Sequence, residues 1–168
     1  MARAWAQSKH VGRVSEITIV SPIREGTVPG ELQTYRQRLE RVLEGLQERI
    51  DDGVSTPPGL IETIHFARWF ILDLPAHSAL LVFTSNFDGD IKQYFRDFSV
   101  AIPQDIDEVW ENCTGYPQPN GCRDFEAFWR FARDHQVETT CFVPAYPDLT
   151  VKDIRLMRAA QLRREVDA

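Results

Sequence analysis

The stretch TIHFARWFIL (63–72) and the stretch ALLVFTSNF (79–87) that follows it decide the fold of this 168-residue chain. Both are rich in β-branched and aromatic residues, which favour strands over helices. The residues between them, DLPAH (73–77), are too few for a crossover, so the two strands are expected to pair antiparallel. Two further strands are predicted at 16–23 (EITIVSPI) and 137–145 (VETTCFVPA).

Helices are expected between these strands and after the last one. The first should cover 29–52, where apolar residues recur at spacings of three and four. A second should follow Asp90 and a third should cover 125–132. Thr150 with Asp153 has the spacing of a capping box and should begin the last helix.

The resulting order is β-α-β-β-α-(α)-β-α, which is that of a ferredoxin-like fold. We therefore expect an α+β domain with a four-stranded antiparallel sheet and helices on one of its faces. The domain should cover residues 15–168, which is long enough to bury a core. Residues 1–14 show no periodicity and are expected to form a flexible arm.

The predicted strands are apolar on both faces, whereas an antiparallel sheet with one solvated face alternates apolar and polar residues. In 63–72, one face carries His65, Ala67, Trp69 and Ile71, and the other carries Ile64, Phe66, Arg68, Phe70 and Leu72. Helices on one side leave the second face uncovered. We expect a homodimer through that face, with a helix at 125–132 folded over it as the alternative.

Composition excludes several classes of function. A net charge of −6, from 19 basic and 25 acidic residues, disfavours a nucleic-acid partner. No apolar run reaches the length of a membrane span or a signal peptide, so we expect a cytoplasmic protein without a membrane partner. The three cysteines, Cys113, Cys122 and Cys141, match no disulfide framework and no zinc-ligand spacing, so no metal site is expected.

Four segments carry a resemblance to known proteins: HFARW (65–69), TSNFDGD (84–90), NCTGYP (112–117) and RLMRAAQLRRE (155–165). They resemble those of a bacterial family of about this length whose function is uncharacterised. The topology over 15–150 resembles the dimeric α+β barrel superfamily, in which two ferredoxin-like chains press their sheets together. This resemblance implies a fold rather than an activity, because the superfamily includes small monooxygenases, polyketide cyclases, muconolactone isomerases and haem enzymes.

His65 and Arg68 are the candidate catalytic residues. They lie three residues apart on a predicted strand, so their side chains should point to opposite faces unless a bulge intervenes. His65 is either a general base, an axial haem ligand or a hydrogen-bonded structural residue. Arg68 is either a clamp for a ligand carboxylate or half of an ion pair, with Asp73, Asp88 or an acidic residue of a helix as the partner.

Five further residues are candidates for ligand binding. Asn86 and Asp88 stand where a predicted strand ends, although Asp88 would also suit a helix cap. Trp69, Tyr116 and Tyr146 could line a pocket with aromatic walls or simply belong to the core.

Three functions remain open on these observations. The first is a homodimer that binds a small, largely apolar molecule in a pocket between sheet and helices. As an enzyme it would need no cofactor and would catalyse proton transfer, cyclisation or oxygenation, with His65 as the base. The second is a haem protein of the peroxidase type, with His65 or the more distant His135 as the iron ligand. The third is a non-catalytic partner or regulatory subunit.

Overall fold

The computed structural model describes residues 5–53, 60–75 and 77–166. Across these residues the chain is an α+β protein with five α-helices and one open antiparallel sheet. The long strands are β2 (Val14–Pro22), β3 (Ile64–Leu72) and β4 (Leu80–Asp88), and β4 lies between the other two. Two short strands, β1 (His10–Val11) and β5 (Gln136–Val137), pair with the other edge of β2. This strand order is consistent with a ferredoxin-like sheet.

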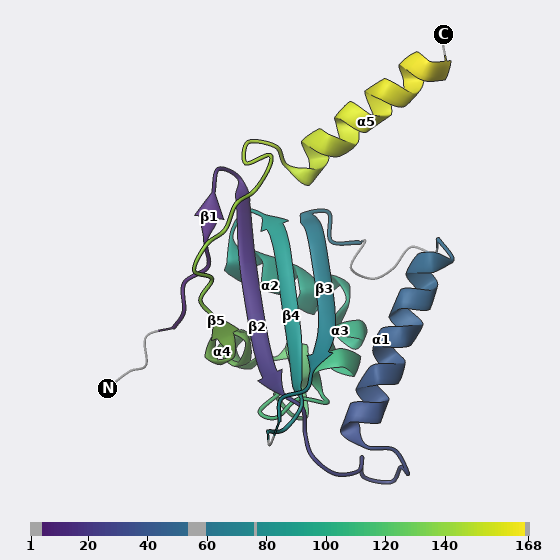
Figure 1. Cartoon of the computed structure of the whole chain (residues 1–168), viewed down its shortest axis with the longest axis vertical. Helices are drawn as coiled ribbons and strands as arrows, with labels where there is room; N and C mark the ends of the chain where they lie inside the picture. Colours follow the sequence, from purple (N-terminus) through teal and green to yellow (C-terminus); the bar gives the residue numbers. More distant parts are fainter. Residues whose placement is uncertain (1–4, 54–59, 76, 167–168) are drawn as a thin grey trace.

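The helices cover one face of the sheet. Helices α2 (Ile91–Ala101), α3 (Pro103–Trp110) and α4 (Phe125–Asp134) lie behind the strands in Figure 1, with the short 3-10 turn η2 (Gly121–Arg123) just before α4. Helix α1 (Tyr35–Asp51) stands beside the β3 edge, and α5 (Val151–Val166) projects from the body (Figure 1). The alternative that 125–132 covers the second face is wrong, because Phe128 of α4 packs against Phe95 of α2.

The hydrophobic core lies between the sheet and this helix layer. Alternate residues of β4 point into it, and Phe83 and Phe87 are at most 2% exposed. Phe83 packs edge-on against Trp110 of α3, while Phe87 stacks on Tyr94 of α2 with ring centroids 4.0 Å apart. Burial of such rings is the main stabilising contribution to the fold.

The predicted hairpin is confirmed. Strands β3 and β4 pair antiparallel from Leu72 opposite Leu80 to Ile64 opposite Phe87. The predicted helix start at Asp90 is also confirmed, because its carboxylate accepts a hydrogen bond from the Gln93 N–H at 2.9 Å.

The first helix begins later than predicted. It starts at Tyr35, where Thr34 is the N-cap and forms a capping box with Gln37. Leu32, which the periodicity places on the buried stripe, is fully exposed in the preceding loop. The capping residue rather than the first apolar residue therefore sets the start of the helix.

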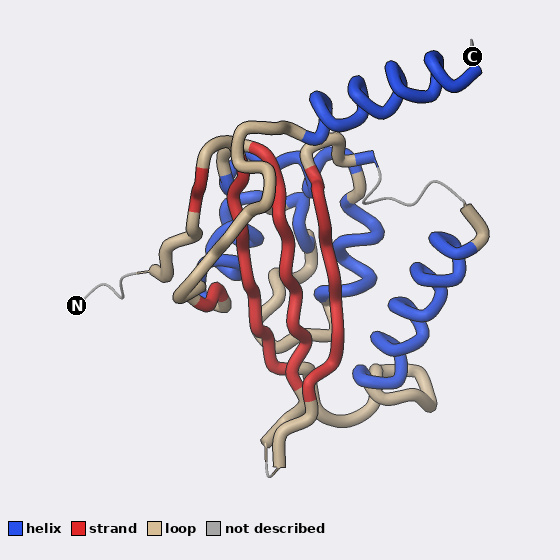
Figure 2. Tube along the Cα trace, turned by 45° about the horizontal axis from the view of Figure 1, so that its top comes forward, coloured by secondary structure: helices blue, strands red, loops and turns tan. Residues whose placement is uncertain are grey.

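The strand predicted at 137–145 is wrong in extent, because only Gln136–Val137 joins the sheet. The edge of β2 that it would need is already paired with β1, at Val14 and Ser15. Pro144 also lacks the N–H that ladder pairing requires. The chain after β5 leaves the sheet and runs in front of β2 as a loop before it reaches α5 (Figure 2).

The described part of the predicted N-terminal arm contacts α4. The Trp5 indole N–H donates to Asp134 Oδ1 at 2.9 Å, and the Arg133 guanidinium donates to the Ala6 carbonyl at 2.8 Å. Residues 1–4 of the predicted arm lie outside the described residues.

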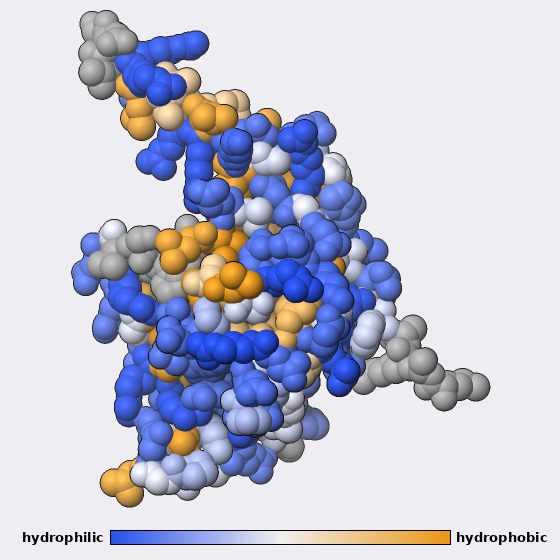
Figure 3. Space-filling model, turned by 180° about the vertical axis from the view of Figure 1, so that it is seen from behind, coloured by the Kyte–Doolittle hydropathy of each residue, from blue (hydrophilic) through white to orange (hydrophobic). Residues whose placement is uncertain are grey.

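The second face of the sheet stays open and partly apolar. Phe66 and Phe70 of β3 are 68% and 44% exposed, and Leu72 continues the same row. The opposite side of the molecule is largely hydrophilic, with apolar side chains gathered on and beside α5 and in a second group in the middle of the view (Figure 3). Within the described residues, no helix is both long enough and apolar enough to cross a bilayer.

Candidate functional site

The main cavity lies on the open face of the sheet, where the loop 142–146 and the start of α5 meet the strands. Its volume is about 700 Å³, which is within the range of small-molecule sites. Most of its wall is apolar. It is lined by Val14, Ile64, His65, Phe66, Asn86, Phe142, Val143, Pro144, Ala145, Tyr146, Val151, Ile154 and Arg155.

This position corrects the prediction of a pocket between sheet and helices. On that side the packing is dense, and the cavity beside Trp69, between α1 and α3, measures only about 20 Å³. The packing around Trp69 therefore leaves no space for a ligand of useful size. A second cavity of about 390 Å³ lies at the β1 edge of the sheet, where Ser15, Ile91 and Arg133 are among its lining residues.

Hydrogen bonds hold the loop that forms one wall of the cavity. Thr139 donates to the buried carboxylate of Glu16 on β2 at 2.6 Å, and the Arg13 N–H donates to the Pro147 carbonyl at 2.7 Å. These two contacts fasten the segment between β5 and α5 across the open face at its two ends.

A β-bulge at His65 decides which residues meet in the cavity. Ile64 pairs with Phe87 and Phe66 with Asn86, so His65 is the extra residue of β3. A bulge re-aims the side chain of the inserted residue, and His65 and Phe66 consequently line the same cavity.

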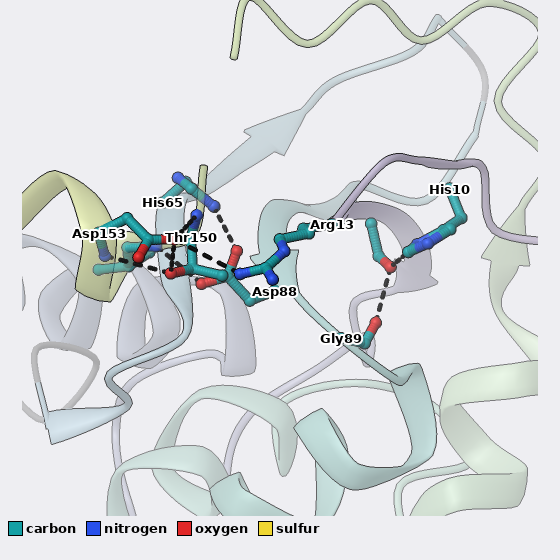
Figure 4. Close-up of polar contacts among 9 residues, drawn as sticks. His10, Arg13, His65, Asp88, Gly89, Thr150 and Asp153 are labelled. Atoms are coloured by element: carbon teal, nitrogen blue, oxygen red, sulfur yellow. Dashed lines mark hydrogen bonds and ion pairs between the residues drawn. The ribbon is translucent and has the colours of Figure 1, made fainter. Parts of the chain in front are cut away.

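Asp88 connects His65 to α5. Its Oδ1 lies 2.8 Å from His65 Nε2, and its Oδ2 accepts a hydrogen bond from the Val151 N–H at 2.8 Å. Both side chains of the pair are nearly buried, at 11% and 13% exposure. Figure 4 shows the second ring nitrogen of His65 pointing away from Asp88. One carboxylate thus orients the imidazole and caps a helix that begins 63 residues later.

The start of α5 is fixed by a second set of contacts. Thr150 and Asp153 form the predicted capping box, and Arg13 lies 3.5 Å from the Asp153 carboxylate (Figure 4). Hydrogen bonds from Thr150 lower the pKa of Asp153 below its usual value. The stabilising contribution of this carboxylate is therefore complete above the usual aspartate range and is lost only as the pH falls through the lowered pKa.

The structure brings four of the seven predicted site residues together. His65, Asn86 and Tyr146 line the cavity, and Asp88 holds His65. The other three lie elsewhere: Arg68 beyond the cavity, and Trp69 and Tyr116 in the core.

Arg68 is exposed on the open face of β3, opposite Thr84, and does not line the cavity. The two aspartates proposed as its ion-pair partners, Asp73 and Asp88, are engaged by other side chains. Asp73 is bonded by Arg36 and Asp88 by His65. Within the described residues Arg68 forms neither the predicted ion pair nor a contact with the cavity.

Trp69 and Tyr116 belong to the core. Trp69 lies against Phe83, with ring centroids 4.9 Å apart. Tyr116 is buried in the helix layer, where its hydroxyl donates to Asp107 at 2.6 Å. Burial and the Asp107 carboxylate together raise the pKa of Tyr116 above its usual range, so the phenol stays neutral.

Sequence reasoning missed residues 142–145 of the loop and the start of α5, including Arg155. The error follows from assigning 137–145 to a strand. Pro144 and Pro147 were the available signal, because two prolines so close together disfavour a sheet strand and favour an extended loop.

The two predicted haem ligands lie in different places. His65 lines the cavity with one ring nitrogen held by Asp88, and Arg155 is the only arginine or lysine among the described residues of the cavity wall, whereas haem carries two propionates. His135 lies outside the cavity at the end of α4, with its Nδ1 2.8 Å from the Phe131 carbonyl and its ring packed on Phe131. No group of three possible metal ligands occurs among the described residues.

Fold and site define an α+β protein with an open antiparallel sheet and an apolar cavity on its open face. Comparison with known proteins extends this description no further: no family model, no curated protein and no solved structure matches the chain.

Proposed function

We propose that the protein binds a small, largely apolar molecule in the cavity on the open face of its sheet. The observation that carries this proposal is the cavity of about 700 Å³, whose wall is apolar except for His65, Asn86, Arg155 and the Tyr146 hydroxyl. Few polar groups in an otherwise apolar cavity are typical of sites that orient a ligand.

The chemistry proposed for this site is cofactor-free proton transfer at His65. An imidazole held on one nitrogen by a carboxylate has a defined orientation and keeps its other nitrogen for a ligand. The His65–Asp88 pair has this arrangement, and His65 lies on the cavity wall.

We also propose that two copies associate through their open faces, as the resemblance to dimeric α+β barrels implies. Phe66 is 68% exposed and lines the cavity, while Phe70, at 44% exposed, extends the apolar row beyond it. A partner sheet would bury this row and close the cavity from solvent. Apolar rows of this kind on a sheet commonly mark an interface.

The binding proposal is tested with N-phenyl-1-naphthylamine, a neutral probe whose fluorescence rises in apolar surroundings. Asn86→Trp places an indole on the floor of the cavity and should abolish the fluorescence increase. Thr84→Trp, on the same face of the same strand but outside the cavity wall, should retain it. Equal probe binding by both variants would show that the cavity is not the binding site.

A further inference from the structure

The cavity has one fixed charge on its wall. Arg155, the fifth residue of α5, is the only arginine, lysine, aspartate or glutamate among the described residues that line it. The chain as a whole carries a net charge of −6, whereas the fixed charge at this cavity is positive. Its role depends on whether a carboxylate of the protein already neutralises it.

No carboxylate of the described residues pairs with Arg155. The salt bridges at this end of the molecule join Arg13 to Asp153 and His65 to Asp88. Asp88 is further used by the Val151 N–H, and Asp153 by Thr150. Asp88 and Asp153 are thus committed to other groups, and no hydrogen bond or salt bridge among the described residues joins Arg155 to Asp148. The Arg155 guanidinium therefore keeps its donors for another group.

The positive end of α5 does not compete for the same ligand. The Val151 N–H is bonded to Asp88, and the Asp153 N–H is bonded to Thr150 Oγ1. Two of the N–H groups that a helix start leaves unsatisfied are therefore occupied by side chains. Arg155 is the cationic group that the cavity offers to a bound molecule.

We propose that the ligand is an amphipathic organic acid, with an apolar body in the cavity and one carboxylate held by Arg155. This inference rests on the proposed binding function and specifies its ligand class. A guanidinium binds a carboxylate through two parallel N–H donors, while Phe142, Tyr146 and Ile154 surround the apolar body. A neutral molecule of the same shape would leave Arg155, which is exposed, bonded to water alone.

The test compares two probes that share one ring system. N-phenyl-1-naphthylamine is neutral, and 1-anilinonaphthalene-8-sulfonate carries one negative charge. Arg155→Ala should weaken binding of the anionic probe about 10- to 100-fold, as expected for loss of a charge-assisted contact, and change binding of the neutral probe less than about twofold. Arg155→Lys should recover part of the lost affinity.

The matched control is Arg158→Ala, which removes an exposed arginine of α5 that does not line the cavity, and should affect neither probe. Unchanged binding of the anionic probe by Arg155→Ala would overturn the inference, as would an equal loss for both probes.

Variants that fill the cavity distinguish a wrong ligand class from a wrong binding proposal. Asn86→Trp, or Ile154→Trp if the first does not fold, should abolish binding of both probes. Full binding of both probes by a folded cavity-filling variant would overturn the binding proposal itself. Suppose that the cavity-filling variants bind neither probe, while Arg155→Ala still binds the anionic probe as the wild type does. This result would reject the proposed ligand class and leave the binding proposal standing.

Discussion

The two faces of the sheet differ in how completely their side chains are buried. On the helix face, Ile17, Ile19, Leu81, Phe83 and Phe87 are all at most 2% exposed, and aromatic side chains from α2 and α3 pack against Phe83 and Phe87. On the open face, Phe66 and Phe70 remain accessible, and a loop and one helix start enclose a cavity instead of filling it.

Under the proposed function, the helix face stabilises the fold and the open face binds the ligand. Where the helix face is densely packed, its stabilising energy comes from apolar area removed from water. The open face holds the bulge, the His65–Asp88 pair and the unpaired Arg155, none of which contributes to that core. The two faces should therefore respond differently to mutation.

The largest expected effect is on the helix face. Phe83→Ala should lower the free energy of unfolding by about 3–5 kcal/mol, because it leaves a cavity among packed aromatic rings. Phe66→Ala should lower it by less than about 1 kcal/mol in the monomer, because the ring is 68% exposed. Urea denaturation at protein concentrations low enough to give monomer measures both. A large loss for Phe66→Ala would mean that this part of the open face is covered within one chain.

The second effect concerns association through the open face. Phe70→Glu places a charge in the proposed interface and should raise the dimer dissociation constant by roughly 30-fold or more, equivalent to about 2 kcal/mol. Leu32→Glu is the matched control, since Leu32 is fully exposed in a loop away from the sheet. Sedimentation velocity measures the change, and a wild-type monomer at micromolar concentration would reject the dimer.

A third, smaller effect compares two aspartate caps. Asp88→Ala and Asp90→Ala each remove a helix cap and should cost about 1–2 kcal/mol of stability. Only Asp88 also holds His65, so only Asp88→Ala should weaken binding of the neutral probe. Thermal melts and probe titrations on the same samples give both quantities. Equal probe binding by the two variants would show that the His65–Asp88 contact has no influence on the cavity.

The smallest effect is a labelling difference. Burial raises the pKa values of Cys113 and Cys122 to about 12, which suppresses the reactive thiolate at pH 8. Cys141 is exposed in the loop that crosses the open face. A colorimetric thiol reagent should therefore label one cysteine per native chain at pH 8 and three in urea. Fast labelling of more than one native thiol would show that the helix layer opens readily.

Local sequence was sufficient to predict most of the helices and strands. The hairpin, the cap at Asp90 and the capping box at Thr150 depend on residues close together in the chain, and all three predictions are confirmed. The candidates Asn86, His65 and Tyr146 line one cavity, as polar or loop residues beside apolar strands tend to do.

The predictions that were wrong depend on contacts between distant residues. Whether 137–145 forms a full strand depends on whether β1 already pairs with the edge of β2, and β1 and β5 lie more than 120 positions apart in the chain. Strand periodicity likewise placed His65 and Arg68 on opposite faces, but it could not show the bulge that re-aims His65.

By itself, the sequence determined an α+β chain with an antiparallel hairpin, amphipathic helices and two apolar sheet faces, because these follow from short-range spacing and side-chain type. Tertiary structure alone decided where the cavity lies, which carboxylate holds His65, and that Arg155 stands at its wall. Those contacts join β3, β4 and α5, whose relative placement results from packing of the whole chain and leaves no local pattern in the sequence.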